Sequence, residues 1–380
     1  MDMQKTRTWA EISLGALRHN VETIRAALPR NCALMGVVKA DGYGHGAVSA
    51  ARTLREAGAA YLAVACPEEA IFLRTAGETL PILILGASDA EWAPVLAENG
   101  IAQTVECVEK GRALSAALRP GQTLKIHIKL DTGMGRLGFR ATDEDALWEA
   151  AEVMHLPGLE PEGVFTHFAV SDTEGEEDYT WAQFENYVEG VQFLQEAAGR
   201  GFAIHHCANS GAVAAFREEG FCLEMVRPGL LTYGIGPMEH GDTGGLDLIP
   251  AMELKSRVAA VTHHAKGDTV SYGRTWTAER DCTLAVLPIG YADGLQRCLS
   301  GKLEVLLRGQ RVKQVGRICM DVCMLDVTDV PGVEPGDEVT VFGRGTDGAP
   351  TACELAELAD TIPYEILCGV SPRVPRVYLP

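Results

Sequence analysis

The stretch Leu34-Met-Gly-Val-Val-Lys39, which runs on into Ala40-Asp-Gly-Tyr-Gly-His-Gly46, contains the first of eight short apolar runs that decide the fold. The runs are rich in branched aliphatic residues, and amphipathic stretches with a helical period separate them. The expected strands cover residues 34–38, 61–65, 82–85, 102–105, 124–130, 163–166, 203–206 and 223–226. Alternating strands and helices indicate parallel strands with crossover helices, and eight repeats close an α/β barrel of the (β/α)8 TIM type.

A doubly wound open sheet is the alternative for this alternating pattern. Such a sheet typically carries a Gly-x-Gly-x-x-Gly turn after its first strand, with an acidic residue about 20 positions later. The glycines at 42, 44 and 46 do not have that spacing. The pattern therefore favours the barrel.

The pattern changes beyond about residue 240, where short alternating runs follow a glycine-rich loop. Strands are expected at 258–261, 284–287, 303–306, 322–327 and 338–342, with one helix at 351–358. Turn residues between the runs are typical of an all-β arrangement. We therefore expect residues 11–240 to form the barrel and residues 241–380 a mostly β C-terminal domain, with which residues 1–10 pack.

The composition excludes several classes of function. The chain has 380 residues, and its 52 acidic and 33 basic residues give a formal net charge of −19 without a local basic patch, so we expect neither a nucleic-acid partner nor an anionic membrane partner. Its longest apolar runs have about ten residues, against roughly 20 for a membrane-spanning helix. The first nine residues lack the apolar core of a signal peptide, which predicts a cytoplasmic protein.

The sulfur-containing residues do not suggest a disulfide framework or a metal site. The chain has 11 cysteines and no Cys-x-x-Cys pair, which indicates free thiols in a cytosolic protein. Cys319 and Cys323, and the run His205-His206-Cys207, lack the second half of a zinc signature. The histidines of that run are expected to pack or to form hydrogen bonds at the end of a strand.

Lys39 is the first candidate for chemistry, because active-site residues of such barrels gather at the carboxyl ends of the strands. It closes an apolar strand, where burial disfavours the charged form, lowers the pKa and makes a neutral, nucleophilic amine accessible. An amine of this kind can form a Schiff base. A lysine that extends from the strand end into water is the alternative. The glycines that follow favour the first interpretation, since they would let the backbone approach a ligand while Tyr43 reaches over it.

The fifth expected strand, residues 124–130, alternates between apolar residues and the polar residues Lys125, His127 and Lys129. Both faces of a barrel strand should be buried. Lys129 would then be an unpaired cation, unless an anion meets it or the amine is chemically modified.

The segment Val37–Gly46 resembles the cofactor-lysine motif of alanine racemases, which are pyridoxal-phosphate (PLP) enzymes of fold type III. Other motifs of that family follow in the family's order and span nearly the entire chain: Asp131-Thr-Gly-Met-Gly-Arg-Leu-Gly138, Thr166-His-Phe-Ala169, Ala208-Asn-Ser210, Arg227-Pro-Gly229, Ser271-Tyr-Gly-Arg-Thr-Trp276, Tyr291-Ala-Asp-Gly294, Cys319-Met-Asp321 and Pro363-Tyr-Glu365. Each motif alone is a weak or moderate signal, but the ordered set is highly specific. The family's fold, a barrel followed by a mostly β domain, agrees with the periodicity.

The resemblance implies interconversion of L- and D-alanine by a two-base mechanism, with Lys39 and Tyr272 on opposite faces of the substrate–cofactor adduct. Loss of the α-proton leaves a planar carbanion, so inversion requires a proton donor on each face. Lys39 would also hold PLP covalently. Tyr272, whose ordinary pKa is about 10, would need nearby positive charge or hydrogen-bond donors, for which Arg136 and His167 are candidates.

The resemblance also implies the residues that bind the cofactor, namely Lys39, Tyr43, His167, Ser210, Arg227, Gly229, Leu230 and Tyr364. Donors after the seventh and eighth strands would hold the phosphate. Arg227 would face the pyridine nitrogen. Because a guanidinium is hardly deprotonated in proteins, that nitrogen would stay unprotonated and the ring would be a weaker electron sink. We take this as a hypothesis for the suppression of side reactions such as transamination.

The substrate-binding residues that the resemblance implies are Arg136, Tyr291, Met320 and Asp321, around a cavity that holds little more than a methyl group. Lys129 is predicted to be N-carboxylated and to orient Arg136, a role that a chloride ion fills in some relatives. Tyr272 and Met320 would reach the cofactor of the other subunit in a head-to-tail homodimer. Val322 stands where the family frequently has a glutamine, which leaves the details of the substrate entrance open.

Other functions remain open at this point. A racemase for serine or a broader set of amino acids is one, because apolar pockets reject small additions weakly. Decarboxylases on the same barrel would not need Tyr272 as an opposing base. A non-catalytic PLP-binding protein of a single barrel would lack the second domain, and a cofactor-free aldolase using Lys39 is the last alternative. Synthesis of D-alanine is not distinguished from its breakdown.

Overall fold

The computed structural model describes residues 6–380, which divide into two compact units. The barrel unit comprises residues 17–42 and 47–248. The β unit comprises residues 43–46, residues 249–380 and the N-terminal residues up to Ala16. The expectation for residues 1–10 falls in part on residues 1–5, which lie outside the described residues.

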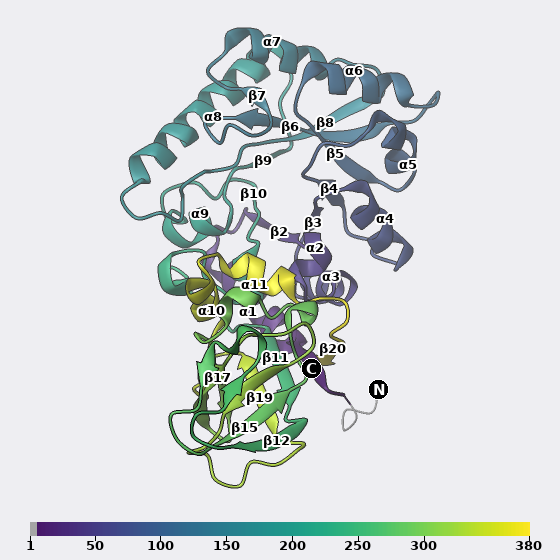
Figure 1. The fold of residues 1–380 in the computed structure, drawn as a ribbon. Coiled ribbons are helices and arrows are strands. Elements are labelled where there is room, and N and C mark those ends of the chain that lie inside the picture. Colours follow the sequence, from purple (N-terminus) through teal and green to yellow (C-terminus); the bar gives the residue numbers. More distant parts are fainter. Residues whose placement is uncertain (1–5) are drawn as a thin grey trace. The chain divides into compact units, whose positions relative to one another are not determined.

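The barrel unit is built on eight parallel strands (Figure 1). In hydrogen-bonded order they are β10 (Met225–Val226), β2 (Ala33–Val37), β3 (Tyr61–Val64), β4 (Ile82–Ile84), β5 (Ile101–Val105), β6 (Leu124–Asp131), β8 (Leu159–Phe165) and β9 (Ile204–His206). The short strand β7 (Phe139–Arg140) pairs with β6 outside this path. A backbone hydrogen bond of 2.9 Å from the Arg227 N–H to the Ala208 carbonyl bridges the ends of β10 and β9, so the barrel is nearly closed. The predicted TIM-type barrel is confirmed.

Helices alternate with these strands. They are α1 (Leu14–Ala27), the turn-like α2 (Lys39–Tyr43), α3 (Ala47–Glu56), α4 (Pro67–Thr75), α5 (Ala93–Glu98), α6 (Val108–Ala117), α7 (Glu144–Val153), α8 (Glu177–Ala198) and α9 (Ser210–Ala215). Local signals set their ends: Pro67 occupies the first turn of α4, and the Asp143 carboxylate accepts hydrogen bonds from the first turn of α7. Within residues 6–380, no helix combines the length and the apolar character that a membrane crossing requires.

The strands of the barrel are buried on both faces. Every residue of β3, β4 and β5 is buried, as expected for a parallel sheet enclosed by helices. Polar residues on such strands must therefore find partners inside the barrel, and the loops at the carboxyl ends of the strands are left to carry the chemistry.

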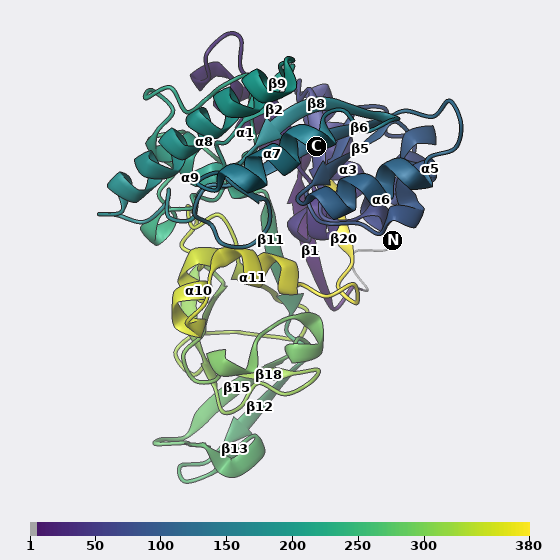
Figure 2. The ribbon, with the colours of Figure 1, turned by 90° about the horizontal axis from the view of Figure 1, so that it is seen from above.

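The β unit contains a nine-stranded sheet. Its order is β12 (Ala260–His264), β15 (Cys282–Leu287), β18 (Cys323–Asp326), β17 (Gln310–Val315), β16 (Glu304–Leu307), β19 (Glu338–Phe342), β11 (Met252–Arg257), β1 (Thr8–Ser13) and β20 (Arg376–Leu379). Figure 2 shows β12, β15 and β18 grouped together, and the consecutive helices α10 (Ala352–Ala359) and α11 (Pro363–Gly369). The predicted mostly β C-terminal domain is confirmed.

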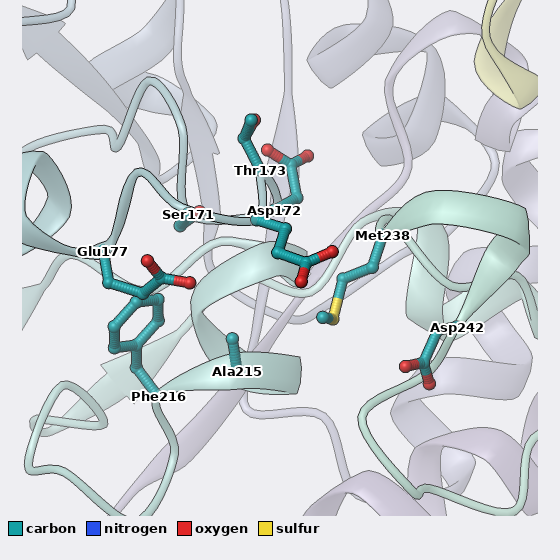
Figure 3. A pocket seen from close by; sticks show the side chains of 9 residues that line it. Ser171, Asp172, Thr173, Glu177, Ala215, Phe216, Met238 and Asp242 are labelled. Atoms are coloured by element: carbon teal, nitrogen blue, oxygen red, sulfur yellow. The ribbon is translucent and has the colours of Figure 1, made fainter.

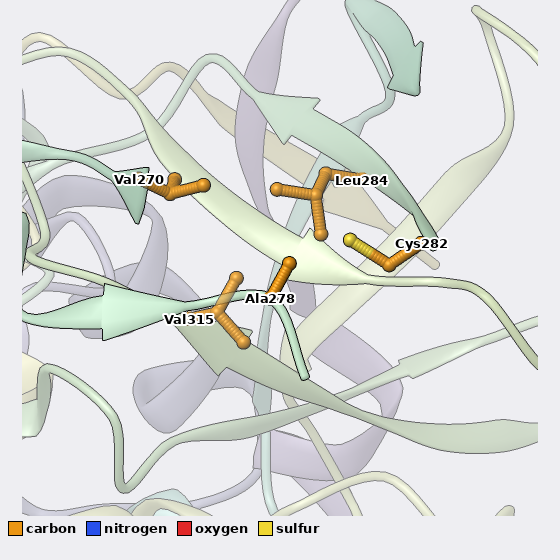
Figure 4. Close-up of a cluster of buried hydrophobic side chains, with 5 residues drawn as sticks. All are labelled: Val270, Ala278, Cys282, Leu284 and Val315. Carbon is orange, nitrogen blue, oxygen red and sulfur yellow. The ribbon is translucent and has the colours of Figure 1, made fainter. Parts of the chain in front are cut away.

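A hairpin of β13 (Thr269–Val270) and β14 (Trp276–Thr277) carries Tyr272 in its turn. It is anchored on a buried apolar cluster made of Val270, Ala278, Cys282, Leu284 and Val315 (Figure 4). Because three elements of the β unit contribute to this cluster, the base of the hairpin is fixed although its turn is exposed.

Candidate active site

The predicted site residues of the barrel unit follow the carboxyl ends of its strands. Lys39 follows β2, Arg136 lies between β6 and β7, His167 follows β8, Ser210 follows β9, and Arg227 follows β10. Burial lowers the pKa of His167 well below its ordinary value, and the positive charges of Arg227, Arg136, Lys129 and Lys39 add to this effect. These charges therefore converge around one neutral histidine at the end of the barrel.

Arg227 is buried, and its two terminal nitrogens are held by the surrounding strand ends. Nη1 donates to Nδ1 of His206 (2.9 Å) and to the carbonyl of the same residue (2.8 Å). Nη2 donates to the carbonyls of Thr166 (2.7 Å) and Cys207 (3.2 Å), and lies 3.4 Å from Nδ1 of His167. Burial lowers the pKa of Arg227 to about 10, so the group stays protonated at neutral pH. In the described part of the chain no acceptor meets its Nε–H, which is the donor left for a ligand.

A chain of buried side chains continues from Arg227 through the barrel interior. Nε2 of His206 lies 2.8 Å from Nδ1 of His127, and Nε2 of His127 lies 3.3 Å from the Glu162 carboxylate. A guanidinium only donates and a carboxylate only accepts. His206 must therefore accept at Nδ1 and donate at Nε2, and His127 must do the same, so that both rings are neutral. Burial lowers the pKa of both histidines, in agreement with this assignment.

Glu162 is the anionic end of this chain. Burial alone would raise its pKa, but hydrogen bonds from His127, Lys125 and Tyr61 lower the pKa to about 2. The Tyr61 hydroxyl donates to the carboxylate at 2.8 Å. Our expectation that His206 forms hydrogen bonds at a strand end is confirmed, whereas the sequence analysis missed the roles of His127 and Glu162. The alternation along β6 was the signal for His127, since it placed that residue on the interior face.

Ser210 connects the ends of β9 and β10. Its hydroxyl oxygen accepts a hydrogen bond from the Gly229 N–H at 2.8 Å, and the Leu231 N–H lies 3.5 Å away. The neighbouring Asn209 caps α9 by accepting from the Ala212 N–H, and Ser171 donates to the same amide oxygen. A buried hydroxyl and inward backbone donors thus lie together at this end of the barrel.

Lys129 lies on β6 with only 4% of its surface exposed. Burial and the charges of Arg136 and Arg227 lower the pKa of its amine to about 8. Its amine lies 5.5 Å from the centre of the Phe165 ring. Among the described residues, no carboxylate lies within ion-pair distance of the amine. The burial expected for Lys129 is thus observed, and its carboxylation stays a prediction.

Three adjoining loops of the β unit carry Tyr272, Tyr291 and Met320. Ser271 has a left-handed φ of 69°, which is costly for a residue with a Cβ, and its hydroxyl is held by the Arg317 carbonyl at 2.8 Å. The same hydroxyl lies 3.5 Å from the Cys319 sulfur, and the Tyr291 N–H donates to the Cys319 carbonyl. The side chains of Tyr272, Met320 and Tyr291 are 72%, 52% and 43% exposed. Exposed large apolar groups on rigid, strained loops are typical of an interaction surface.

Tyr43 and Tyr364 also belong to the β unit, with ring centres 5.7 Å apart. Burial, with Tyr364 and Cys368 nearby, raises the pKa of the Tyr43 hydroxyl, so this group is a neutral hydrogen-bond donor. Asp321 forms an ion pair of 2.8 Å with Arg373, which also contacts the buried Asp293. That pairing orients Asp321 in the loop that holds Met320.

A cavity of about 390 Å³ lies elsewhere in the barrel unit, between the 171–177 segment and the end of α9 (Figure 3). Asp172, Glu174, Glu177 and Asp242 line it. Its described lining residues include neither a predicted site residue nor a cation that an anionic cofactor could bind.

The sequence matches the family model of the alanine racemase N-terminal domain over residues 12–237 and that of the alanine racemase C-terminal domain over residues 251–378. The chain belongs to the alanine racemase family. It is 45% identical over 384 residues to the alanine racemase of Desulfosudis oleivorans, covering 99% of this chain and 97% of that one. It is 43% identical to alanine racemase 1 of Clostridium acetobutylicum, covering 98% and 95%. The enzyme class of isomerase is therefore confirmed.

Solved structures of the alanine racemase family have the same fold. The alanine racemase of Clostridium difficile 630 matches with a TM-score of 0.92 at 40% identity, covering 99% of this chain and 96% of that one. The Bacillus anthracis enzyme, solved with bound L-Ala-P, matches with a TM-score of 0.92 at 39% identity, covering 99% and 95%. A histidine racemase from Leuconostoc mesenteroides also matches, with a TM-score of 0.89 at 30% identity, covering 99% of each chain.

Proposed function

We propose that the protein interconverts L- and D-alanine, with PLP bound at the carboxyl end of the barrel and the two bases supplied by Lys39 and Tyr272. The observation that carries this proposal is the set of positive charges around His167, in which Lys39 and Arg227 belong to different strand ends of one barrel. The full-length similarity to alanine racemases supports the substrate.

The donor set of the barrel unit fits this cofactor. The free Nε–H of Arg227 suits an unprotonated ring nitrogen, because the guanidinium keeps its proton at a pKa of about 10. The hydroxyl of Ser210 and the N–H groups of Gly229 and Leu230 suit a phosphate, to which the Gly229 N–H would turn from the Ser210 hydroxyl. His167 lies beside Arg227. Tyr43 and Tyr364 would add hydroxyl donors. When bound, PLP supplies an electron sink that acidifies the substrate's α-proton.

Racemisation requires that protons be held on two faces. In the proposed mechanism the Lys39 amine takes the α-proton of one enantiomer while the Tyr272 hydroxyl donates a proton on the opposite face, and the roles reverse for the other enantiomer. His167 and Arg136 would stabilise the tyrosinate form. The exposed position of Tyr272 in a strained turn supports a role at an interface rather than in the core.

The substrate carboxylate would bind the Arg136 guanidinium and the Met320 N–H, with Tyr291 and Asp321 lining the entrance. Arg136 needs an anion to orient it within a cluster of cations. Carboxylation of the Lys129 amine would supply that anion, because carbon dioxide adds to a neutral amine and the lowered pKa increases the neutral fraction. A bound chloride would serve the same purpose.

We propose a homodimer in which each site is completed by Tyr272 and Met320 of the partner subunit. The support is the exposure of these two side chains on fixed loops of the β unit, where a second copy would cover them. The expected compartment is the cytoplasm, with no nucleic-acid or membrane partner.

A racemase of other substrates is the second candidate, since a histidine racemase has the same fold at 30% identity. α-Proton exchange and optical rotation should be measured with L-alanine, L-serine and L-histidine. We expect exchange and inversion with alanine, which should be abolished in Lys39→Ala together with the visible absorption of the loaded protein. Exchange faster with serine or histidine would overturn the assignment to alanine, and retained absorption in Lys39→Ala would overturn the role of Lys39.

A further inference from the structure

The chain makes an unusual turn directly after Lys39. Ala40, Asp41, Gly42 and Tyr43 all have φ values between 51° and 62°. This is a left-handed turn, and three of its four residues carry a Cβ that disfavours the conformation. Such a turn persists only where the surrounding structure holds it.

Glu69, in the first turn of α4, holds the start of this turn. Its Oε1 accepts a hydrogen bond of 2.7 Å from the Ala40 N–H, and its Oε2 accepts one of 2.7 Å from the Ala65 N–H. Ala40 lies just beyond β2, and Ala65 just beyond β3, its hydrogen-bonded neighbour. One carboxylate therefore ties together the ends of two adjacent strands.

The contact with Ala40 has a direct consequence for Lys39. The Ala40 N–H belongs to the peptide unit whose carbonyl is that of Lys39, so fixing this N–H fixes the ψ angle of Lys39. Downstream, the Asp41 carboxylate accepts from the Ala47 N–H at 2.7 Å, which holds the other end of the turn. Upstream, the Tyr233 hydroxyl donates to the Val37 carbonyl at 2.9 Å.

We propose that Glu69 is a positioning residue that sets the direction in which the Lys39 side chain leaves the barrel strand. This inference rests on the proposed function only in taking the Lys39 amine as the reactive group. Glu69 acts through the peptide unit between Lys39 and Ala40, because its carboxylate accepts the hydrogen bond from the Ala40 N–H.

A carboxylate is required because both partners of Glu69 are donors. A glutamine has one oxygen and one amide group. In Glu69→Gln the amide group would meet one of the two N–H groups, so that one hydrogen bond is lost and two donors face each other. In Glu69→Asp the side chain is shorter by one methylene, so the carboxylate reaches only one of the two N–H groups.

The test compares Glu69→Gln with Glu68→Gln, which removes the same charge from the exposed neighbouring residue on α4. Amide hydrogen exchange of the cofactor-free protein is measured first. We expect exchange to be about tenfold faster in Glu69→Gln at Ala40 or at Ala65, whichever N–H faces the new amide group, which corresponds to the loss of one hydrogen bond. Exchange at both residues should be unchanged in Glu68→Gln.

Kinetics and spectra are then measured on the loaded enzyme. Misplacement of a reacting group by about 1 Å costs on the order of 100-fold in rate, so kcat of Glu69→Gln should fall roughly 10- to 100-fold in both directions. KM should change much less, and the pH at which the visible band titrates should shift. Glu69→Asp should fall between the wild type and Glu69→Gln, which keeps the test available if Glu69→Gln does not fold.

Faster exchange in Glu69→Gln with wild-type kcat and an unshifted band would overturn the proposal and leave the proposed function intact. Unchanged exchange at both Ala40 and Ala65 would overturn it as well. If the wild type shows no racemisation, the proposed function fails, and the exchange data still decide whether Glu69 holds the turn.

Discussion

The two groups of predicted site residues differ in how they are held. In the barrel unit, Arg227 and Lys129 are each 4% exposed, and several strand ends fix the guanidinium. In the β unit, Tyr272 and Met320 are 72% and 52% exposed, whereas the residues that precede them, Ser271 and Cys319, are held by hydrogen bonds within the unit. The first group is preorganised within its unit, whereas the second presents side chains on a rigid loop.

This difference suggests that the barrel unit binds the cofactor, whereas the β unit supplies side chains that another surface must cover. Buried cations are costly unless hydrogen bonds and distant anions compensate for them. The barrel provides that compensation with backbone carbonyls and with the chain from Arg227 to Glu162, which suits permanent binding of an anionic cofactor. An exposed tyrosine has no such cost, but it can act only where another surface covers it.

The largest effect should come from removing the exposed base. In Tyr272→Phe we expect racemisation to fall by about 10²- to 10⁴-fold, the usual contribution of a positioned acid or base. Because Lys39 would still serve one face, solvent exchange of the α-proton should persist with one enantiomer and be lost with the other. Proton NMR in deuterated water, with L- and D-alanine supplied separately, measures both.

The control for this prediction is Thr277→Ser, an exposed position on β14 of the same hairpin, which should behave like the wild type. Exchange that is lost equally for both enantiomers would contradict the two-base assignment, because it would mean that Tyr272 does not serve a single face.

The sequence predicted the barrel better than the β unit, for physical reasons. All eight barrel strands were expected, because buried parallel strands are continuous aliphatic runs such as β3 and β4. Strands β11 and β17 were not expected. Their sequences, Met252-Glu-Leu-Lys-Ser-Arg257 and Gln310-Arg-Val-Lys-Gln-Val315, are largely polar, and their pairing depends on neighbours that lie far away in sequence. The stretch between the fourth and fifth expected strands forms helix α6, although Gly111 interrupts its helical pattern.

That glycine is explained only by tertiary packing. A Cβ at position 111 would lie 2.8 Å from the Val153 side chain, so glycine lets α6 pack closely. In the site, too, residues whose role depends on tertiary contacts could not be predicted from the sequence. Lys39 and Lys129 could be inferred from their places on strands, whereas Glu162 and Glu69 could not, because their partners come from other strands and loops.

The second prediction tests the division between subunits by complementation. Lys39→Ala and Tyr272→Phe should each be inactive, and the two proteins are mixed under conditions that allow subunits to exchange. If sites are completed by the partner, half of the dimers are mixed, and each mixed dimer has one site with both bases. About a quarter of the wild-type activity should then return. No recovery, with subunit exchange demonstrated by mass spectrometry, would show that both bases come from one chain.

The third prediction concerns Glu162, the anionic end of the hydrogen-bonded chain that begins at Arg227. The pKa of Glu162 is lowered from 4.5 to about 2, which corresponds to about 3 kcal/mol of stability. A depressed carboxyl pKa stabilises the fold above the unfolded-state pKa, and this contribution is lost as the pH falls through 4.5 towards 2. Glu162→Gln should therefore unfold at lower denaturant concentration at pH 7, and its stability should depend less on pH between 5 and 3.

Glu160→Gln is the matched control, since Glu160 is an exposed residue on the same strand, β8. It should keep the pH dependence of the wild type. If the stability of Glu162→Gln depends on pH in the same way as that of the wild type, Glu162 is not the anion that stabilises the hydrogen-bonded chain from Arg227.

The smallest effect on activity is expected from the chemical state of Lys129, which tests whether a buried cation of the barrel unit needs an anion beside it. With a pKa of about 8, roughly a fifth of the amine is neutral at pH 7.4, against about 0.1% for an ordinary lysine. Carbon dioxide can then add to the amine, and the carbamate would place an anion among the cations that surround His167.

Activity in buffer freed of carbon dioxide should fall a few-fold and recover with bicarbonate. The intact mass at neutral pH should include one additional carboxylate that acid removes. Chloride should partly replace bicarbonate if only the charge matters. An unmodified Lys129 in fully active, chloride-free protein would contradict this prediction, because Arg136 would then be oriented without an anion and the barrel would tolerate an uncompensated buried cation.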